Sequence, residues 1–69
     1  MIFNYLKRFV NSLTFEQKTH LIMSEKLLNN EALNRNDAYL IAIKEAIDDK
    51  NVIFSLKRLI NFDSLSRLW

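Results

Sequence analysis

The only histidine in the sequence, His20, is the first residue to consider for metal binding or acid–base chemistry. Glu16 lies four residues before it, so both side chains would share one face of a helix and could hold a cation together. A zinc site in a protein needs at least three protein ligands, and the neighbouring sequence supplies no third. We therefore expect His20 to be a surface or partly packed residue, and we predict no metal site.

Nucleophilic catalysis would need a serine or cysteine beside a base that a third group orients. Cysteine is absent, and the serines fall where helix caps are expected. The acidic residues Asp48, Asp49 and Asp63 do not fit an EF-hand, whose loop needs Gly at its sixth position and Glu at its twelfth. Nucleotide-binding motifs also depend on glycine, and the chain has none. We predict that the protein is not an enzyme and uses no cofactor.

The length of 69 residues indicates one small helical domain spanning 1–69. A chain of this size buries only about 60% of the surface that its unfolded form exposes, so its stability is marginal. No disulfide or zinc–thiolate site can compensate, because there is no cysteine. The domain must therefore pack its helices efficiently, or bury an apolar face against a second copy or another protein.

Glycine and proline are both absent, which is the most unusual feature of the composition. Glycine is the usual residue where a turn needs positive φ, and it dominates tight hairpin turns. Turns in this chain must be made by Asn, Asp and Ser, which tolerate the left-handed conformation or cap helices with their side chains. This composition favours helices joined by short connections.

Apolar residues recur at helical spacing in four segments. We predict an all-α fold, a small bundle of three to four short helices at about 2–11, 15–32, 37–48 and 51–61, followed by a C-terminal turn. Thr14 and Gln17 fit a capping box at the start of the second helix, and Asn34 or Asn36 is the expected cap of the third. The cleanest amphipathic pattern lies in the third helix, where the predicted buried stripe is Tyr39, Leu40, Ile43, Ala46 and Ile47.

The acidic pair Asp48–Asp49 separates the last two helices. At the C-terminus of a helix these carboxylates would oppose the helix dipole, whereas at the N-terminus of the next helix they are favourable. We therefore assign them to the start of the fourth helix, with Asp49 or Asn51 as its cap and a hinge between the two helices at residues 48–51.

The net charge of +2 says little about partners, but charge is unevenly distributed: residues 1–20 and 51–69 are basic, and residues 21–50 are acidic. No secretion signal is recognisable, and the longest apolar run, Tyr39–Ile43, is far too short for a membrane span. We expect a cytoplasmic protein. The abundance of Asn, Ile, Lys and Phe suggests an AT-rich coding sequence, typical of some bacteria, plasmids and phages.

The leading hypothesis is a small regulatory or inhibitory protein that binds a larger protein through a helix face and forms a homodimer. Such docking uses apolar anchors at helical spacing, and aromatic residues dominate interface hot spots. The predicted anchors are Phe3, Tyr5, Phe54, Phe62 and Trp69.

Two alternatives remain open. A nucleic-acid-associated transcriptional or nucleoid modulator would use the cations near the two ends of the chain, Lys7, Arg8, Lys57, Arg58 and Arg67. A peripheral membrane protein would instead place the short cationic helix at 2–11 on a lipid surface. We regard this membrane alternative as weaker than the nucleic-acid alternative.

Overall fold

The computed structural model describes the backbone of residues 2–68 and the side chains of residues 4–61. Over these residues the chain forms four helices and no strand: α1 (Ile2–Asn11), α2 (Phe15–Leu28), α3 (Arg35–Glu45) and α4 (Asp49–Leu68). The prediction of a small all-α bundle is confirmed.

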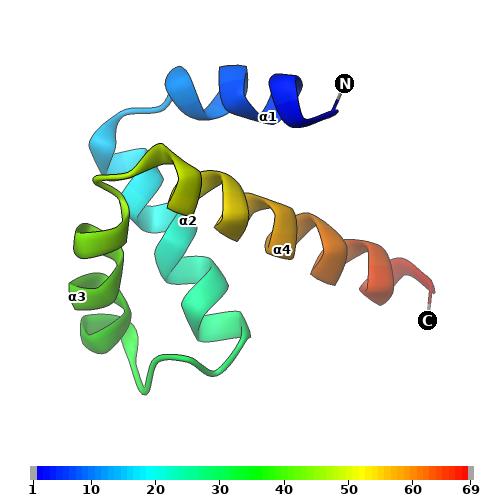
Figure 1. The fold of residues 1–69 in the computed structure, drawn as a ribbon. Coiled ribbons are helices and arrows are strands. Elements are labelled where there is room, and N and C mark those ends of the chain that lie inside the picture. The colour runs from blue at the N-terminus through cyan, green and yellow to red at the C-terminus, as the bar shows by residue number, and fades with distance from the viewer. Residues whose placement is uncertain (1, 69) are drawn as a thin grey trace.

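The helices are arranged with α4 between α1 and α2, while α3 packs against α2 (Figure 1). The pair α2 and α3 is antiparallel, and α4 runs diagonally across α2 (Figure 1). The Cα atoms extend over 34 × 32 × 14 Å, so the molecule is flat. Its radius of gyration of 12.0 Å is slightly above the roughly 11 Å expected for a compact chain of this length. A flat bundle of this size leaves large apolar side chains exposed on several helices.

The hydrophobic core combines a few branched side chains with a row of alanines. Ala38 and Ala42 on α3 and its C-cap residue Ala46 are buried at four-residue intervals. Helix separation depends on the side chains at the contact, so methyl groups on this face let α2 and α3 approach closely. The other buried apolar residues are Leu6, Val10, Ile22, Met23, Val52 and Ile53.

The predicted buried stripe of α3 is therefore largely wrong. Tyr39 and Leu40 are about half exposed and Ile47 is 79% exposed, while only Ala46 of the predicted set is fully buried. The helix is rotated from the expected orientation because its alanine face allows a closer approach to α2 than the bulky face would. Periodicity alone favoured the larger side chains.

Helix boundaries agree with the prediction for α1 and differ for the others. Helix α2 ends at Leu28 and not at 32, and α3 spans Arg35–Glu45 and not 37–48. Helix α4 begins at Asp49 and continues to Leu68, so the predicted end at 61 and the separate C-terminal turn are wrong. The chain has no glycine or proline after Asn61 to end the helix, and Asp63–Ser64 are accommodated within it.

The end of α2 shows how the chain turns without glycine. Asn30 has a φ of 58°, which is the left-handed conformation that Asn tolerates better than most residues. The amide of Asn30 donates to the Leu27 carbonyl at 3.2 Å, and the amide of Glu31 donates to the Lys26 carbonyl at 2.9 Å. These two bonds form a Schellman motif, in which asparagine takes the usual place of glycine.

Side-chain hydrogen bonds cap the starts of α2, α3 and α4. The capping box of Thr14 and Gln17 is present in both directions, at 3.1 and 2.8 Å. Asn34 caps α3 by accepting from the Asp37 amide at 2.9 Å. Asp48 accepts from the Lys50 amide at 3.0 Å, so the acidic pair belongs to the start of α4 as predicted. The cap is Asp48, however, and the turn lies at residues 46–48.

Replacing Asn30 tests the Schellman motif. We expect Asn30→Ala to lower the free energy of unfolding by about 1 kcal/mol, because alanine is strained at positive φ, and Asn30→Gly to leave stability unchanged or raised. Urea titrations of both variants give the comparison. Asn36→Ala within α3 is the control, and a loss there equal to that of Asn30→Ala would show that the left-handed turn is not the cause.

Candidate partner-binding surface

The outer face of α4 carries a pocket of about 270 Å³ lined by Lys50, Ile53, Phe54 and Lys57. These positions follow the i, i+3, i+4, i+7 spacing of a single helix face. Ile53 is nearly buried and forms part of the core, while Phe54 is 56% exposed. The pocket therefore has an apolar floor with one lysine toward each end.

The ring of Phe54 is covered on one side by a charged group. The guanidinium carbon of Arg58 lies 4.6 Å from the ring centroid, within the range of a cation–π interaction. Arg58 is itself held from the other direction, because its Nη1 atom lies 3.5 Å from a carboxylate oxygen of Glu25 and 3.5 Å from one of Glu31. The exposed aromatic ring is thus connected to a polar network below α4.

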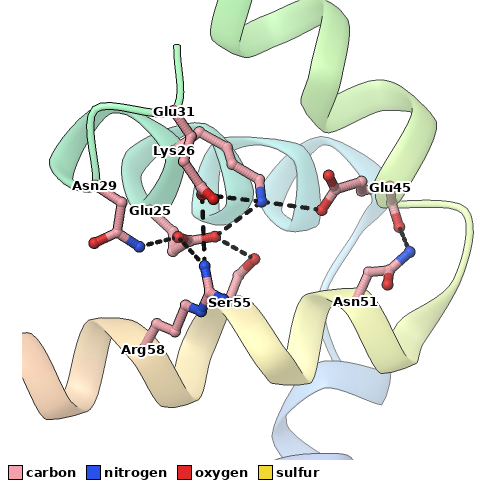
Figure 2. A network of polar contacts seen from close by, with 8 residues as sticks. All are labelled: Glu25, Lys26, Asn29, Glu31, Glu45, Asn51, Ser55 and Arg58. Carbon is pink, nitrogen blue, oxygen red and sulfur yellow. Dashed lines mark hydrogen bonds and ion pairs between the residues drawn. The ribbon is translucent and has the colours of Figure 1, made fainter.

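The centre of this network is the carboxylate of Glu25, which is only 1% exposed (Figure 2). Ser55 on α4 donates its hydroxyl to Glu25 Oε1 at 3.0 Å, and the Asn29 side-chain amide donates to Oε2. Lys26 Nζ lies 3.4 Å from Oε1. Burying a carboxylate is costly unless it is paired and hydrogen-bonded, and these contacts supply both requirements while joining α2 to α4.

Lys26 extends the network to the rest of the chain. Its ammonium lies 3.3 Å from Glu31 in the loop after α2 and 3.5 Å from Glu45 at the end of α3. Asn51 on α4 donates to the backbone carbonyl of Glu45 at 3.2 Å (Figure 2). The network therefore joins α2, α3 and α4 through polar contacts.

The pKa values of both central residues shift toward the charged form. Burial raises the pKa of the Glu25 carboxyl, but the hydrogen bond from Ser55, the charge of Lys26 and the further hydrogen bonds outweigh it, and the pKa falls below its usual value. Burial lowers the pKa of Lys26, but the surrounding carboxylates outweigh it, and this pKa rises above its usual value. The two groups are thus stabilised as an ion pair.

The predicted anchors lie in different parts of the molecule. Phe54 is in the pocket of α4, and Tyr5 is 75% exposed on α1. The side chains of Phe3, Phe62 and Trp69 lie outside the described residues, so their roles remain predictions.

The predicted nucleic-acid contacts are also divided. Lys7 and Arg8 are exposed on α1, which packs against α4, and Lys57 lines the pocket. Arg58 is directed to Glu25 and Glu31, and the side chain of Arg67 lies outside the described residues. Whether the remaining cations contact nucleic acid stays a prediction.

Sequence reasoning missed two parts of this region. The pattern formed by Lys50, Ile53, Phe54 and Lys57 is visible in the sequence as one helix face, but only Phe54 and Lys57 were singled out. Glu25 was overlooked although it follows the buried Ile22 by three residues, which places a carboxylate at a core-facing position. Its partners on α4 could not be identified from local spacing.

The second pocket, of about 310 Å³, is lined by Phe15, Glu16, Thr19, His20 and Tyr39. His20 Nε2 lies 3.8 Å from Glu16 Oε1, on the shared helix face expected from their spacing. Across the side chains that the structure describes, no group of three His, Asp or Glu residues is arranged to hold a metal ion. Both side chains are largely exposed, so this pocket offers little to fix a ligand.

Comparison with known proteins shows no relationship: no family model, no curated protein and no solved structure matches this chain. In the described part of the chain, no helix has the length and apolarity to cross a bilayer. The alternative of a peripheral protein with the helix at 2–11 on a lipid surface stays a prediction. The function is therefore argued from the surface of α4 and the network below it.

Replacing the buried carboxylate tests the network. We expect Glu25→Gln to lower the free energy of unfolding by about 2 kcal/mol, because charged hydrogen bonds are replaced by weaker neutral ones. Chemical denaturation measures the change. The matched control on the same helix is Glu16→Gln, whose exposed carboxylate should matter by less than about 0.5 kcal/mol. Equal effects of the two substitutions would contradict the role of Glu25.

The pH dependence of stability gives a second test. Since folding lowers the pKa of Glu25 below 4.5, its contribution is complete above that value and is lost as the pH falls through the lowered pKa. For Lys26 the contribution is complete below 10.5 and is lost as the pH rises through the raised pKa. We expect the stability difference between the wild type and Glu25→Gln to be constant near neutrality and to shrink in acid. Urea titrations from about pH 7 to 3 measure it, and a constant difference would contradict the account.

Proposed function

We propose that the protein is a non-enzymatic cytoplasmic regulator that binds a larger protein through the outer face of α4. The observation that carries this proposal is the pocket in which the half-exposed Phe54 lies between Lys50 and Lys57 over the apolar floor of Ile53. An aromatic anchor in a shallow apolar depression with a charged rim resembles the centre of a protein–protein hot spot.

The contacts that Arg58 makes beside the pocket support binding. Arg58 is held by two carboxylates and in turn covers the Phe54 ring. A side chain that is already ordered loses less conformational entropy when a partner covers it. The network below α4 therefore stabilises the fold and also prepares Phe54 for contact.

A nucleic-acid partner is less well supported by the same residues. Arg58 is already neutralised by Glu25 and Glu31, and Asp48 and Asp49 stand at the start of α4 beside Lys50. These carboxylates would repel phosphates. Among the described residues, the exposed cations of α1 and α4 are few compared with the six to ten phosphate contacts that make DNA binding strongly dependent on salt.

Self-association would cover another part of the flat molecule. Tyr39 and Leu40 on α3 are 48% and 49% exposed, and Ile47 in the turn after it is 79% exposed. A homodimer through this face would remove them from water while leaving the α4 pocket open. Sedimentation equilibrium decides this part of the proposal: a concentration-dependent dimer that Ile47→Glu converts to monomer is expected, and a monomer at high micromolar concentration would refute it.

The binding role of α4 is tested with Phe54→Ala. We expect tagged wild-type protein to retain a specific partner from extracts of its native cell or host, and Phe54→Ala to weaken that complex about 30-fold, as loss of a hot-spot side chain of about 2 kcal/mol would do. Titration of the recovered partner against both proteins measures the change. Leu33→Ala is the control, because Leu33 is 94% exposed on the loop before α3.

Circular dichroism and urea titration check that Phe54→Ala remains folded. We expect it to fold, because losing the cation–π contact with Arg58 costs only about 0.5–1 kcal/mol at an exposed site. Equal affinity of the wild type and a folded Phe54→Ala variant for the partner would overturn the proposed surface.

A further inference from the structure

The outer face of α3 carries opposite charges at its two ends. Asp37 and Lys44 line one shallow depression with Leu40 and Ile41 between them, and their seven-residue separation corresponds to about 10.5 Å along the helix axis. We propose that a second copy of the chain covers this face, with the two α3 helices antiparallel and Asp37 of each protomer paired with the partner's Lys44. The inference rests on the self-association in the proposed function and specifies its geometry.

Uncovered apolar side chains extend this face beyond both charges. Leu40 at its centre is 49% exposed, and Ile47 just after α3 is 79% exposed. Leu33 precedes the N-cap Asn34, a place from which an apolar residue often packs back onto its own helix, yet it is 94% exposed. Antiparallel pairing brings the N-terminal end of one helix beside the C-terminal end of the other, so Leu33 lies toward the partner's Ile47. Self-association is one of the few ways in which so short a chain gains stability.

Both charges are available to a partner. Lys44 is exposed, and no described side chain pairs with it. Asp37 Oδ2 accepts from the Leu33 amide at 3.0 Å, but this donor is neutral and leaves the negative charge in place. Glu45 also lines the depression, but its carboxylate lies 3.5 Å from Lys26 Nζ. The face therefore offers one positive and one negative charge to whatever covers it.

The arrangement of these charges selects a second copy. The midpoint between Leu40 and Ile41 is equally far along the helix from Asp37 and from Lys44. A twofold axis through this midpoint, perpendicular to α3, places each charge opposite its counterpart and repeats every contact, as an isologous dimer requires. A parallel pair would instead bring each charge beside its own copy in the partner, which like-charge repulsion opposes. A different protein would have to reproduce this reversed pattern, which a second copy carries by symmetry.

Charge reversal tests the ion pairs. Lys44→Glu places a carboxylate opposite the partner's Asp37 twice per dimer, so we expect sedimentation equilibrium to show a dimer dissociation constant raised about tenfold. Lys7→Glu on α1 makes the same charge change away from α3 and should leave the constant unaltered. An equimolar mixture of Lys44→Glu with Asp37→Lys restores both pairs between unlike chains. This mixture should dimerise more tightly than either variant alone, and added salt should narrow the differences.

Cross-linking tests the same geometry without altering Asp37. The chain has no cysteine, so an introduced thiol can form a disulfide only with its copy in the partner. Leu40 lies beside the proposed twofold axis, and Leu40→Cys should oxidise to a disulfide-linked dimer. Lys44→Cys should stay largely monomeric under the same oxidant, because the two Lys44 positions lie about 10.5 Å apart along the antiparallel helices, beyond the reach of a disulfide.

The outcomes separate the orientation of the dimer from its existence. A dimer that Lys44→Glu and Lys7→Glu weaken equally, or in which Lys44→Cys cross-links as readily as Leu40→Cys, would overturn the antiparallel geometry and leave self-association intact. A wild-type protein that stays monomeric at high micromolar concentration would overturn both. Neither result affects the α4 surface, which the affinity of Phe54→Ala for the recovered partner tests separately.

Discussion

The structure depends on one buried carboxylate. Glu25 is almost fully enclosed between α2 and α4, and it is stable there because Ser55, Asn29, Lys26 and Arg58 provide donors and opposite charge around it. A small bundle with a core built partly from alanines has little apolar surface to specify how its helices pack. A fully satisfied polar network adds that specificity, because any other arrangement would leave charges buried without partners.

The same network shapes the surface of the protein. Arg58 reaches from the carboxylates of Glu25 and Glu31 to the ring of Phe54, so an interaction below α4 orders a side chain on its outer face. Removing the network would therefore affect both the packing of the helices and the affinity of the pocket. This connection explains how a chain of 69 residues presents an aromatic side chain to solvent in a defined orientation.

Local features of this fold could be predicted from the sequence, and features that depend on distant residues could not. The Thr14 capping box, the Asn turns and the placement of Asp48 and Asp49 follow from short-range hydrogen bonds and the helix dipole. The buried face of α3 was mistaken because the close approach of α2 selects alanines over larger side chains. The network was missed because Ser55 and Arg58 lie about thirty residues from Glu25, beyond any periodicity.

The central claim is that the outer face of α4 is the binding surface. Chemical-shift mapping on the ¹⁵N-labelled protein tests it most directly, with the partner recovered from extracts of its native cell or host as the titrant. The account predicts that the largest changes occur at the amides of Lys50, Ile53, Phe54 and Lys57, with little change at Tyr39 and Leu40 on α3. Changes concentrated on α1 or α3, with the amides of the α4 pocket unaffected, would contradict it.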